Sequence, residues 1–446
     1  MLSNPFTPSE IASSPDDFFG RSSERAELQR ALNTGSAAIQ GAIGIGKSSL
    51  LALTRLQCEG FGSSTKSASV VVTCHKDITT IDQIAQLILE ELVDVDEREK
   101  TFAFKIGTFF ETGSKEVYRN FVAGRHLAAL QRLLSKESLK AALRDDEMLL
   151  IAIDEADKSP VPLTQLIRAV TNQAQQNGIK NIRFLLAGVA PYYSKMLEED
   201  RGIGRFIYRV INLDPMSDED ANDLLETKLA QTVEESLRTG DELAVDPEVI
   251  PRVRALAGGH PHLLQLLGSH IVEQEDEDPD GIIDARNLTG ALTKICYDDR
   301  GQVYESTLHM LHLENRLDPL LKLFAIGARQ FPTRINRYAA AETIGADALR
   351  WFVDHDILSI ADTDHYGLAD EFLRVRIILD AEQSRDERLR VESAIVRTVT
   401  FGEFAEAELE REEEDEVGIS RDGDEDEPYL LPIEEEDEES DSSFES

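Results

Sequence analysis

A glycine-rich turn between an apolar run and a leucine-rich segment constrains the fold of this chain most strongly. Gly41-Ala-Ile-Gly-Ile-Gly-Lys-Ser48 follows the apolar residues 36–40 and precedes 47–57, where the leucines have helical spacing. A strand, a glycine turn and a helix in this order open an α/β domain. Further runs predict buried parallel strands at 69–73, 148–153 and 182–187, and helices at 21–32, 80–92 and 163–177.

The same turn fits G-x-x-x-x-G-K-[ST], the pattern of a phosphate-binding P-loop. Its glycines let successive N–H groups point at a phosphate, and the helix that follows adds its positive end. Lys47 would contact the β- and γ-phosphates, and the Ser48 hydroxyl would ligate Mg²⁺. Ser49 is the weaker ligand candidate because it lies one position beyond the motif. The predicted nucleotide-binding residues are Gly41, Ala42, Ile43, Gly44, Ile45, Gly46, Lys47, Ser48 and Ser49.

A second motif places two acids at the end of an apolar strand. Leu149-Leu-Ile-Ala-Ile153 is followed by Asp154 and Glu155, at the edge where a parallel sheet presents its ligands. Asp154 is predicted to hold Mg²⁺, directly or through water, and Glu155 to polarise an attacking water. The predicted catalytic residues are therefore Glu155 and Lys47. Asp157 either supports this site or caps the following turn.

Several boxes around these motifs resemble AAA+ and STAND-type P-loop ATPases, including their origin-recognition-like and archaeal-type relatives. The segment Phe18-Phe-Gly20-Arg21 with Glu24 and Leu28 is similar to the box that lies beside the adenine, which implies nucleotide contacts for Gly20 and Arg21. Gly258-Gly-His-Pro261-His262 resembles the motif opening the last lid helix, which implies the same for Pro261. Residues 182–191 resemble the sensor-1 strand of these ATPases. Arg205 and Arg209 resemble the arginine segment that precedes the lid.

The chain departs from that family at two positions. The sensor-1 strand ends in Ala187 and Gly188, without a polar side chain, and the sensor-2 segment has His260 and His262 instead of arginine. The resemblance therefore implies a slow ATPase, or one that waits for an arginine from a neighbouring subunit, which contributes on the order of 10³–10⁵ in rate. His260 either approaches the nucleotide or caps its helix. For Arg205 and Arg209, pairing with nearby acids is the alternative.

The expected fold class is an α/β P-loop parallel sheet with a helical lid, a winged-helix domain and a disordered acidic tail. Helical segments at 318–328, 333–344 and 347–358, followed by two short strands within 357–369, resemble the winged helix that follows the lid in many of these ATPases. The aromatic segment 102–110 predicts an inserted strand or hairpin, as a partner-binding element or a sheet-edge cover. The expected regions are 1–15 (irregular), 16–215 (core), 216–282 (lid), 283–400 (winged-helix region) and 401–446 (tail).

The charge excludes some functions. The formal net charge is −39, and the tail from Gly402 holds about 22 acids against 2 bases. An acidic body repels phosphates, so the charge disfavours DNA as the main partner and an anionic membrane surface. The longest apolar runs are too short to span a bilayer, and Cys58, Cys74 and Cys296 are too few and too far apart for a disulfide framework. Cytoplasm is the expected location.

The expected function is a regulatory switch that binds ATP and Mg²⁺ and hydrolyses ATP, in prokaryotic defence or signalling. The resemblance implies an ATP-dependent homo-oligomer or a protein effector as the partner. Two alternatives stand: a DNA-associated loader or helper ATPase in replication initiation or transposition, and a nucleotide-binding scaffold with negligible hydrolysis. The acidic tail either keeps the protein in solution or binds a basic partner, with Tyr429–Ile433 as a possible docking segment.

Overall fold

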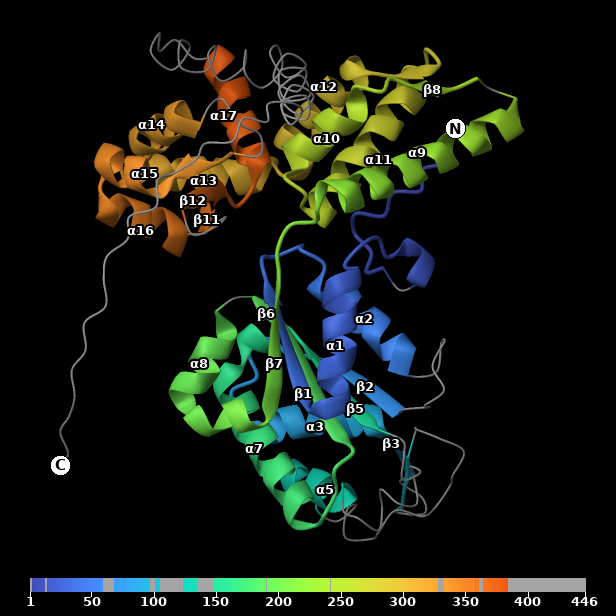
Figure 1. Ribbon diagram of the computed structural model, residues 1–446, viewed down its shortest axis with the longest axis vertical. Helices are drawn as coiled ribbons and strands as arrows, with labels where there is room; N and C mark the ends of the chain where they lie inside the picture. Colours follow the sequence, from blue (N-terminus) through green and yellow to red (C-terminus); the bar gives the residue numbers. More distant parts are fainter. Residues whose placement is uncertain are drawn as a thin grey trace, which may run out of the picture.

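An α/β core lies beneath a layer of helices in the computed structural model (Figure 1). Residues up to Leu213 form most of the core, and the chain then rises into the helical layer, which the N-terminal residues also join. The described residues are 2–12, 14–58, 68–96, 101–104, 120, 123–134, 148–189, 191–240, 242–327, 333–355, 357–360 and 364–383. The predicted tail, including Tyr429–Ile433, lies outside them.

The core contains a parallel five-stranded sheet in the order β2-β5-β6-β1-β7. β1 lies inside the sheet, where Ile39 is in register with Ala187 of β6 and Ile211 of β7. The expected parallel α/β sheet is thus confirmed, although β7 was not predicted as a strand. The strand bounds are β1 Ser36–Gly41, β2 Ala68–Thr73, β5 Leu149–Asp154, β6 Ile182–Val189 and β7 Ile207–Leu213.

Helices cover both faces of this sheet, as the continuous apolar character of its strands requires. Ala37 and Ile39 of β1 pack in one buried cluster with α1 (Ser22–Thr34) and α2 (Lys47–Cys58), whereas Ala38 packs in the cluster on the opposite face. The helices of that opposite face are α3 (Ile81–Leu92), α5 (His126–Leu133), α7 (Pro160–Gln176) and α8 (Tyr192–Glu199). Short 3₁₀ turns are η1 (Pro15–Asp17), η2 (Ala156–Lys158) and η3 (Arg201–Arg205).

The aromatic segment expected at 102–110 contributes one strand of a hairpin. β4 (Thr101–Phe104) pairs antiparallel with β3 (Val93–Asp96), which directly follows α3 and was not predicted. Residues 105–110 lie outside the described part of the chain.

The lid begins after a short linker at the end of β7. Ser217 caps α9 by accepting a hydrogen bond from the Asp220 N–H at 3.1 Å. The helices of the predicted lid are α9 (Asp218–Thr239), α10 (Val249–Ala257) and α11 (Pro261–Glu277), and β8 (Ala244–Val245) pairs parallel with β9 (Ile282–Ile283). The next helix, α12 (Ala285–Lys294), lies beyond the predicted lid boundary. α12 packs along α11, so the helical layer continues past the acidic segment 276–281.

The C-terminal region contains three helices near a three-stranded antiparallel sheet in the order β10-β12-β11. The two strands expected within 357–369 are present as β11 (Leu358–Ile360) and β12 (His365–Leu368). The helix expected from Thr333 begins only at Arg337, because β10 (Ile335–Asn336) precedes it and the Asn336 side chain caps it. The helices are α14 (Leu317–Gly327), α15 (Arg337–Ile344) and α16 (Ala346–Asp354), flanked by π-helix η4 (Ile295–Asp299), α13 (Gly301–Leu313) and α17 (Glu371–Gln383).

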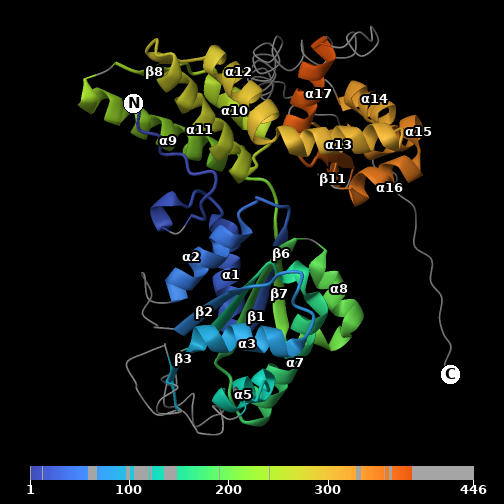
Figure 2. The same ribbon diagram turned by 180° about the vertical axis from the view of Figure 1, so that it is seen from behind.

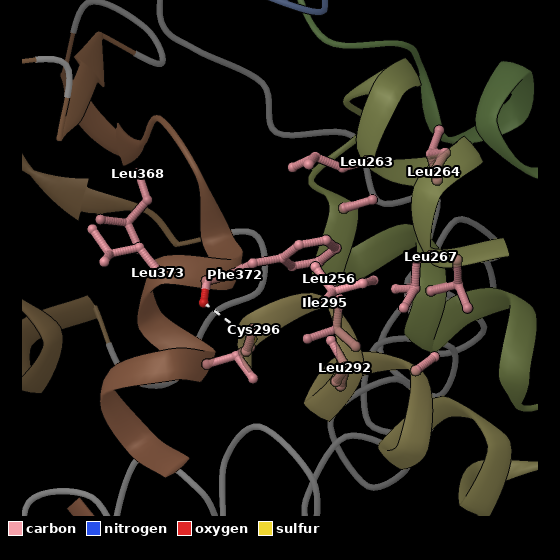
Figure 3. Close-up of a cluster of buried hydrophobic side chains, with 14 of the residues drawn as sticks. Leu256, Leu263, Leu264, Leu267, Leu292, Ile295, Cys296, Leu368, Phe372 and Leu373 are labelled. Atoms are coloured by element: carbon pink, nitrogen blue, oxygen red, sulfur yellow. Dashed lines mark hydrogen bonds between the residues drawn. The ribbon is translucent and has the colours of Figure 1, made fainter. Parts of the chain in front are cut away.

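The lid and the C-terminal region share one hydrophobic cluster. Phe372 at the start of α17 is fully buried, and its ring lies beside Leu256 of α10 and Ile295 of η4 (Figure 3). The Cys296 thiol donates to the Phe372 carbonyl at 3.7 Å across the same junction. Seen from behind, α17 stands next to α10 (Figure 2). Among the helices of the described residues, none has both the length and the apolar composition of a membrane span.

Candidate functional site

A cavity of about 370 Å³ lies where the core meets the helical layer. The predicted residues Arg21, Ile43, Gly44, Ile45, Gly46, Lys47, Ser48, Ser49, Glu155 and Pro261 all line it. Gly20, Gly41, Ala42 and Asp154 do not, and lie beside it in the chain. Its wall also contains residues with no predicted role, namely Thr7–Ala12, Asp17, Lys158, Val189, Leu213, Met216, Leu224 and Gln265.

The glycine-rich turn forms a loop around the Lys47 side chain. Gly44 and Gly46 have φ of 75° and 96°, which residues with a Cβ rarely adopt. Lys47 begins α2, and its ammonium donates to the Gly41 carbonyl at 3.2 Å and the Ala42 carbonyl at 2.6 Å. Burial lowers the pKa of Lys47, although Glu155 and Asp154 act against that shift. The two acids therefore lie close enough to Lys47 to interact with it electrostatically.

The acids occupy the C-terminal end of β5, as the sequence predicted. Asp154 is the last residue of β5, and its Oδ1 accepts from the Glu155 N–H at 2.9 Å. Glu155 has a φ of 53°, a left-handed conformation that costs a non-glycine residue roughly 1–3 kcal/mol. Its side chain is 42 % exposed and lines the cavity, so the strained turn presents the carboxylate to the cavity.

The two serines after Lys47 differ in their contacts. Ser49 Oγ accepts from the Ala12 N–H at 3.2 Å, so it is occupied by the N-terminal segment. Within the described part of the chain, the Ser48 hydroxyl has no hydrogen-bond partner, and it lines the cavity. Ser48 is therefore the serine available to a metal ion. Ser48 and Asp154 provide the oxygen donors that Mg²⁺ prefers, with its other positions left to phosphate and water.

Asp157 supports the neighbouring strand end. Its Oδ1 accepts from the Val189 N–H at 2.9 Å, at the C-terminus of β6. A Cβ at Gly188 would lie 2.9 Å from the Asp157 nitrogen, so glycine permits this approach. Burial alone would raise the pKa of Asp157, but the hydrogen bonds from Val189 and Lys158 outweigh it and the pKa lies below its usual value. Asp157 thus fixes the position of the predicted sensor-1 strand.

Gly20 and Arg21 connect the P-loop to the lid from the side of α1. Arg21 is 6 % exposed, donates to Glu24 at 3.0 Å and reaches the Ile45 carbonyl at 3.3 Å. Gly20 has a φ of 64°, and a Cβ there would lie 2.7 Å from the Asp220 Cβ of α9 and closer still to its carboxylate. The box expected beside the nucleotide therefore packs against both the P-loop and the lid.

Two histidines at the start of α11 face the P-loop. Pro261 is the first residue of α11, and His260 is the residue before it. The His260 ring does not cap the helix; its Nε2 donates to the Ile43 carbonyl at 2.8 Å. Burial lowers the pKa of His260 to about 4, so this ring is neutral near pH 7. His262 donates through Nδ1 to the Pro8 carbonyl at 3.0 Å.

An N-terminal arm, residues 2–12, forms a wall of the cavity that the sequence did not predict. It runs along the lid, where Asn4 donates to the Ser269 carbonyl at 3.1 Å and Lys228 donates to the Pro5 carbonyl at 2.6 Å. Phe6 is 4 % exposed and belongs to the buried cluster of the lid. The arm then bonds α2 through Ser49, so it joins the lid to the helix of the P-loop.

The two arginines of the segment before the lid are exposed. Arg209 on β7 forms an ion pair with Glu27 of α1, in agreement with the simpler of the two alternatives. Arg205 lies at the end of η3 and does not line the cavity.

Comparison with known proteins was made by sequence and by structure. No protein-family model matches the sequence, and no curated protein matches it. Among solved structures, the Walker-type ATPase PABY2304 of Pyrococcus abyssi is similar, with a TM-score of 0.52 at 14 % identity. The match covers 82 % of this chain and 98 % of that one.

Two further matches are weaker. The ORC2 protein of Aeropyrum pernix in its ADPNP–ADP complexes has a TM-score of 0.47 at 14 % identity, over 90 % of this chain and 99 % of that one. The ORC1 protein of the same organism in complex with DNA has a TM-score of 0.45 at 17 % identity, over 82 % of this chain and 94 % of that one. Identities this low establish the fold alone. The chain has the P-loop α/β fold of a Walker-type ATPase, as the sequence resemblance implied.

Proposed function

We propose that this chain binds ATP with Mg²⁺ in the cavity between P-loop and lid and hydrolyses it slowly, as a switch. One observation carries the proposal: Lys47, Ser48 and Glu155 line a single cavity together with the lid residue Pro261. Phosphoryl transfer to water needs an ammonium group, a metal-binding hydroxyl and a carboxylate in one place. These residues supply all three.

Each residue has a distinct task in this proposal. Lys47 exchanges the carbonyls of Gly41 and Ala42 for phosphate oxygens, and Ser48 with Asp154 holds Mg²⁺. The metal, when bound, neutralises charge on the phosphates. Glu155 orients and polarises the attacking water through its exposed carboxylate.

The proposal of slow hydrolysis is supported by the residues at the two predicted sensor positions beside the cavity. The end of β6 presents Ala187 and Gly188, and the start of α11 presents the neutral ring of His260. Neither supplies a cation for the charge that develops on the phosphate. An arginine from a neighbouring copy in an ATP-dependent oligomer, or a protein effector, would then stimulate the rate.

We infer that the C-terminal elements α14–α16 and β10–β12 form a winged-helix module that contacts protein. Its third helix, α16, exposes Asp347 and Asp354 beside the single base Arg350. Base reading in a major groove needs basic or amide side chains with basic flanks. The charge therefore favours a protein partner over DNA. Binding of ATP would change the angle between core and lid, and so the surface that this module offers.

Two variants test the function. Lys47→Ala should abolish binding of a fluorescent ATP analogue, because it removes the ammonium group from the P-loop, whereas the exposed Lys195→Ala should bind normally. Glu155→Gln should bind ATP but release phosphate at least 100-fold more slowly than the wild type, because the water loses its base. Retained binding by Lys47→Ala would refute the site. If wild type and Glu155→Gln bind ATP with the same negligible phosphate release, the chain is a nucleotide-binding scaffold.

A further inference from the structure

Lys158 is a charged residue of the cavity wall to which the function proposed above gives no role. It ends the 3₁₀ turn η2, and its ammonium lies 3.0 Å from Asp157 Oδ2 and 3.4 Å from Glu155 Oε2. The side chain is 31 % exposed and lines the cavity with Lys47 and Glu155. The predicted water-polarising carboxylate is thus bound by a cation within its own site.

The contacts of Lys158 show that it is charged and close to the P-loop lysine. The hydrogen bond to Asp157 raises the pKa of Lys158 above its ordinary value, so the ammonium is charged at neutral pH. Its charge also contributes to the lowered pKa of Lys47, which places the two ammonium groups in one electrostatic neighbourhood. A triphosphate held by Lys47 would lie within the field of both.

The other cations that line the cavity differ from Lys158 in position and contacts. Among the described residues, the lysines and arginines that line the cavity are Arg21, Lys47 and Lys158. Arg21 is bonded to Glu24 and to the Ile45 carbonyl, on the side of α1. Lys158 is the one that lies beside Glu155, where hydrolysis requires the terminal phosphate to be. Because the Glu155 side chain is 42 % exposed, the long Lys158 side chain can leave its carboxylate at the cost of a partly solvated ion pair only.

We propose that Lys158 is a second phosphate-binding cation of this site, which exchanges its ion pair with Glu155 for the terminal phosphate of a nucleoside triphosphate. The proposal rests on the function proposed above. In the absence of that phosphate, Lys158 holds the Glu155 carboxylate. When a triphosphate binds, the ammonium moves to the phosphate and Glu155 is free to accept the proton of the water. A nucleoside diphosphate has no γ-phosphate, so the ion pair persists.

The test compares two nucleotides in equilibrium binding. We would measure the dissociation constants of fluorescent ADP and of a fluorescent non-hydrolysable ATP analogue, each with Mg²⁺, for wild type and Lys158→Met. The triphosphate analogue should bind about tenfold more weakly, which corresponds to about 1.4 kcal/mol, and ADP should change less than twofold. Lys158→Arg should restore the difference between the nucleotides. Lys195→Met, which removes an exposed positive charge from α8, should bind both like the wild type.

The outcomes separate the two proposals. An equal loss for both nucleotides, with a lowered melting temperature, would make Lys158 a structural ion-pair partner and overturn the inference. An unchanged affinity for the triphosphate would overturn it as well. If the wild-type protein binds neither nucleotide, the proposed function itself fails. This result differs from the two outcomes that overturn only the inference about Lys158.

Discussion

The substitution Gly268→Ala should detach the N-terminal arm from the lid while stabilising α11, the helix that contains residue 268. Gly268 lies in the middle of α11, and a Cβ there would lie 2.6 Å from Cδ1 and Cζ of Phe6 and closer still to Cε1. The Phe6 ring cannot move aside within the cluster because it is 4 % exposed. Gly268→Ala should therefore expel the ring and release the arm.

Gly268→Ala should have two effects of opposite sign on stability. Replacing glycine by alanine inside a helix contributes about 1 kcal/mol of stability. Expelling a buried phenylalanine side chain costs about 1.5–3 kcal/mol. Because the arm crosses the lid as a surface segment, we expect the cost to appear as local opening rather than as global unfolding. Each 1.4 kcal/mol of that cost changes the opening equilibrium by a factor of about ten. Amide exchange of the arm, residues 2–12, should therefore become about 10- to 100-fold faster.

Hydrogen exchange with mass spectrometry measures this release, and a double-mutant cycle assigns its cause. In the Phe6→Ala background the clash is absent, so Gly268→Ala should leave arm exchange unchanged and raise the free energy of unfolding. Since Thr7–Ala12 line the cavity, the single Gly268→Ala variant should also bind nucleotide more weakly. The reasoning is refuted if arm exchange stays at the wild-type rate in Gly268→Ala. It is also refuted if that variant loses the same global stability in both backgrounds.

Three further perturbations test other parts of the structure. Phe372→Ala should lower the free energy of unfolding in urea by about 3–5 kcal/mol, because Phe372 is fully buried, whereas the exposed Tyr338→Ala should not. Burial raises the pKa of Glu371 to about 6, so the folded state binds this proton more tightly than the unfolded state does. As the pH falls from 7 to 4.5, the free energy of unfolding of the wild type should therefore rise by about 2 kcal/mol relative to that of Glu371→Gln. Parallel pH profiles of the two proteins would contradict this. Gly20→Ala, strained at a φ of 64° and crowded against Asp220, should weaken nucleotide binding in a fluorescence titration, with Gly178→Ala, also at positive φ but in open space, as the control.

The α/β core was predictable because its signals are local. The β-branched run at 69–73 and the apolar run at 148–153 differ from the observed β2 and β5 by one residue at their ends. The P-loop motif likewise specifies its turn within a few residues. The position of β1 between β6 and β7 was not predictable in this way, because it depends on pairing between segments far apart in the sequence.

The elements that were missed have weak local signals or distant partners. β7 contains Ile211 and Leu213 in alternation, which is typical of a strand, but this alternation covers only the last residues of β7 and is a weak signal. Phe6 is a single aromatic residue among serines and prolines, and its burial depends on the distant Gly268, which leaves room for its ring on α11. The helix expected from Thr333 begins late because Asn336 offers a better cap, a signal that the sequence did contain.

The distribution of hydrophobic clusters explains how a nucleotide could move the upper layer as a unit. The sheet has two clusters of its own, one on each face, whereas the lid and the C-terminal region share a third. The cavity lies between these clusters, and hydrogen bonds cross it, such as those from His260 to the Ile43 carbonyl and from the Ala12 N–H to Ser49. Opening the cavity therefore breaks a few hydrogen bonds and disturbs the upper cluster only where Phe19 and the linker residue Met216 contact it. Separating the lid from the C-terminal region would instead expose Phe372, so rotation at the linker is the movement of lower cost.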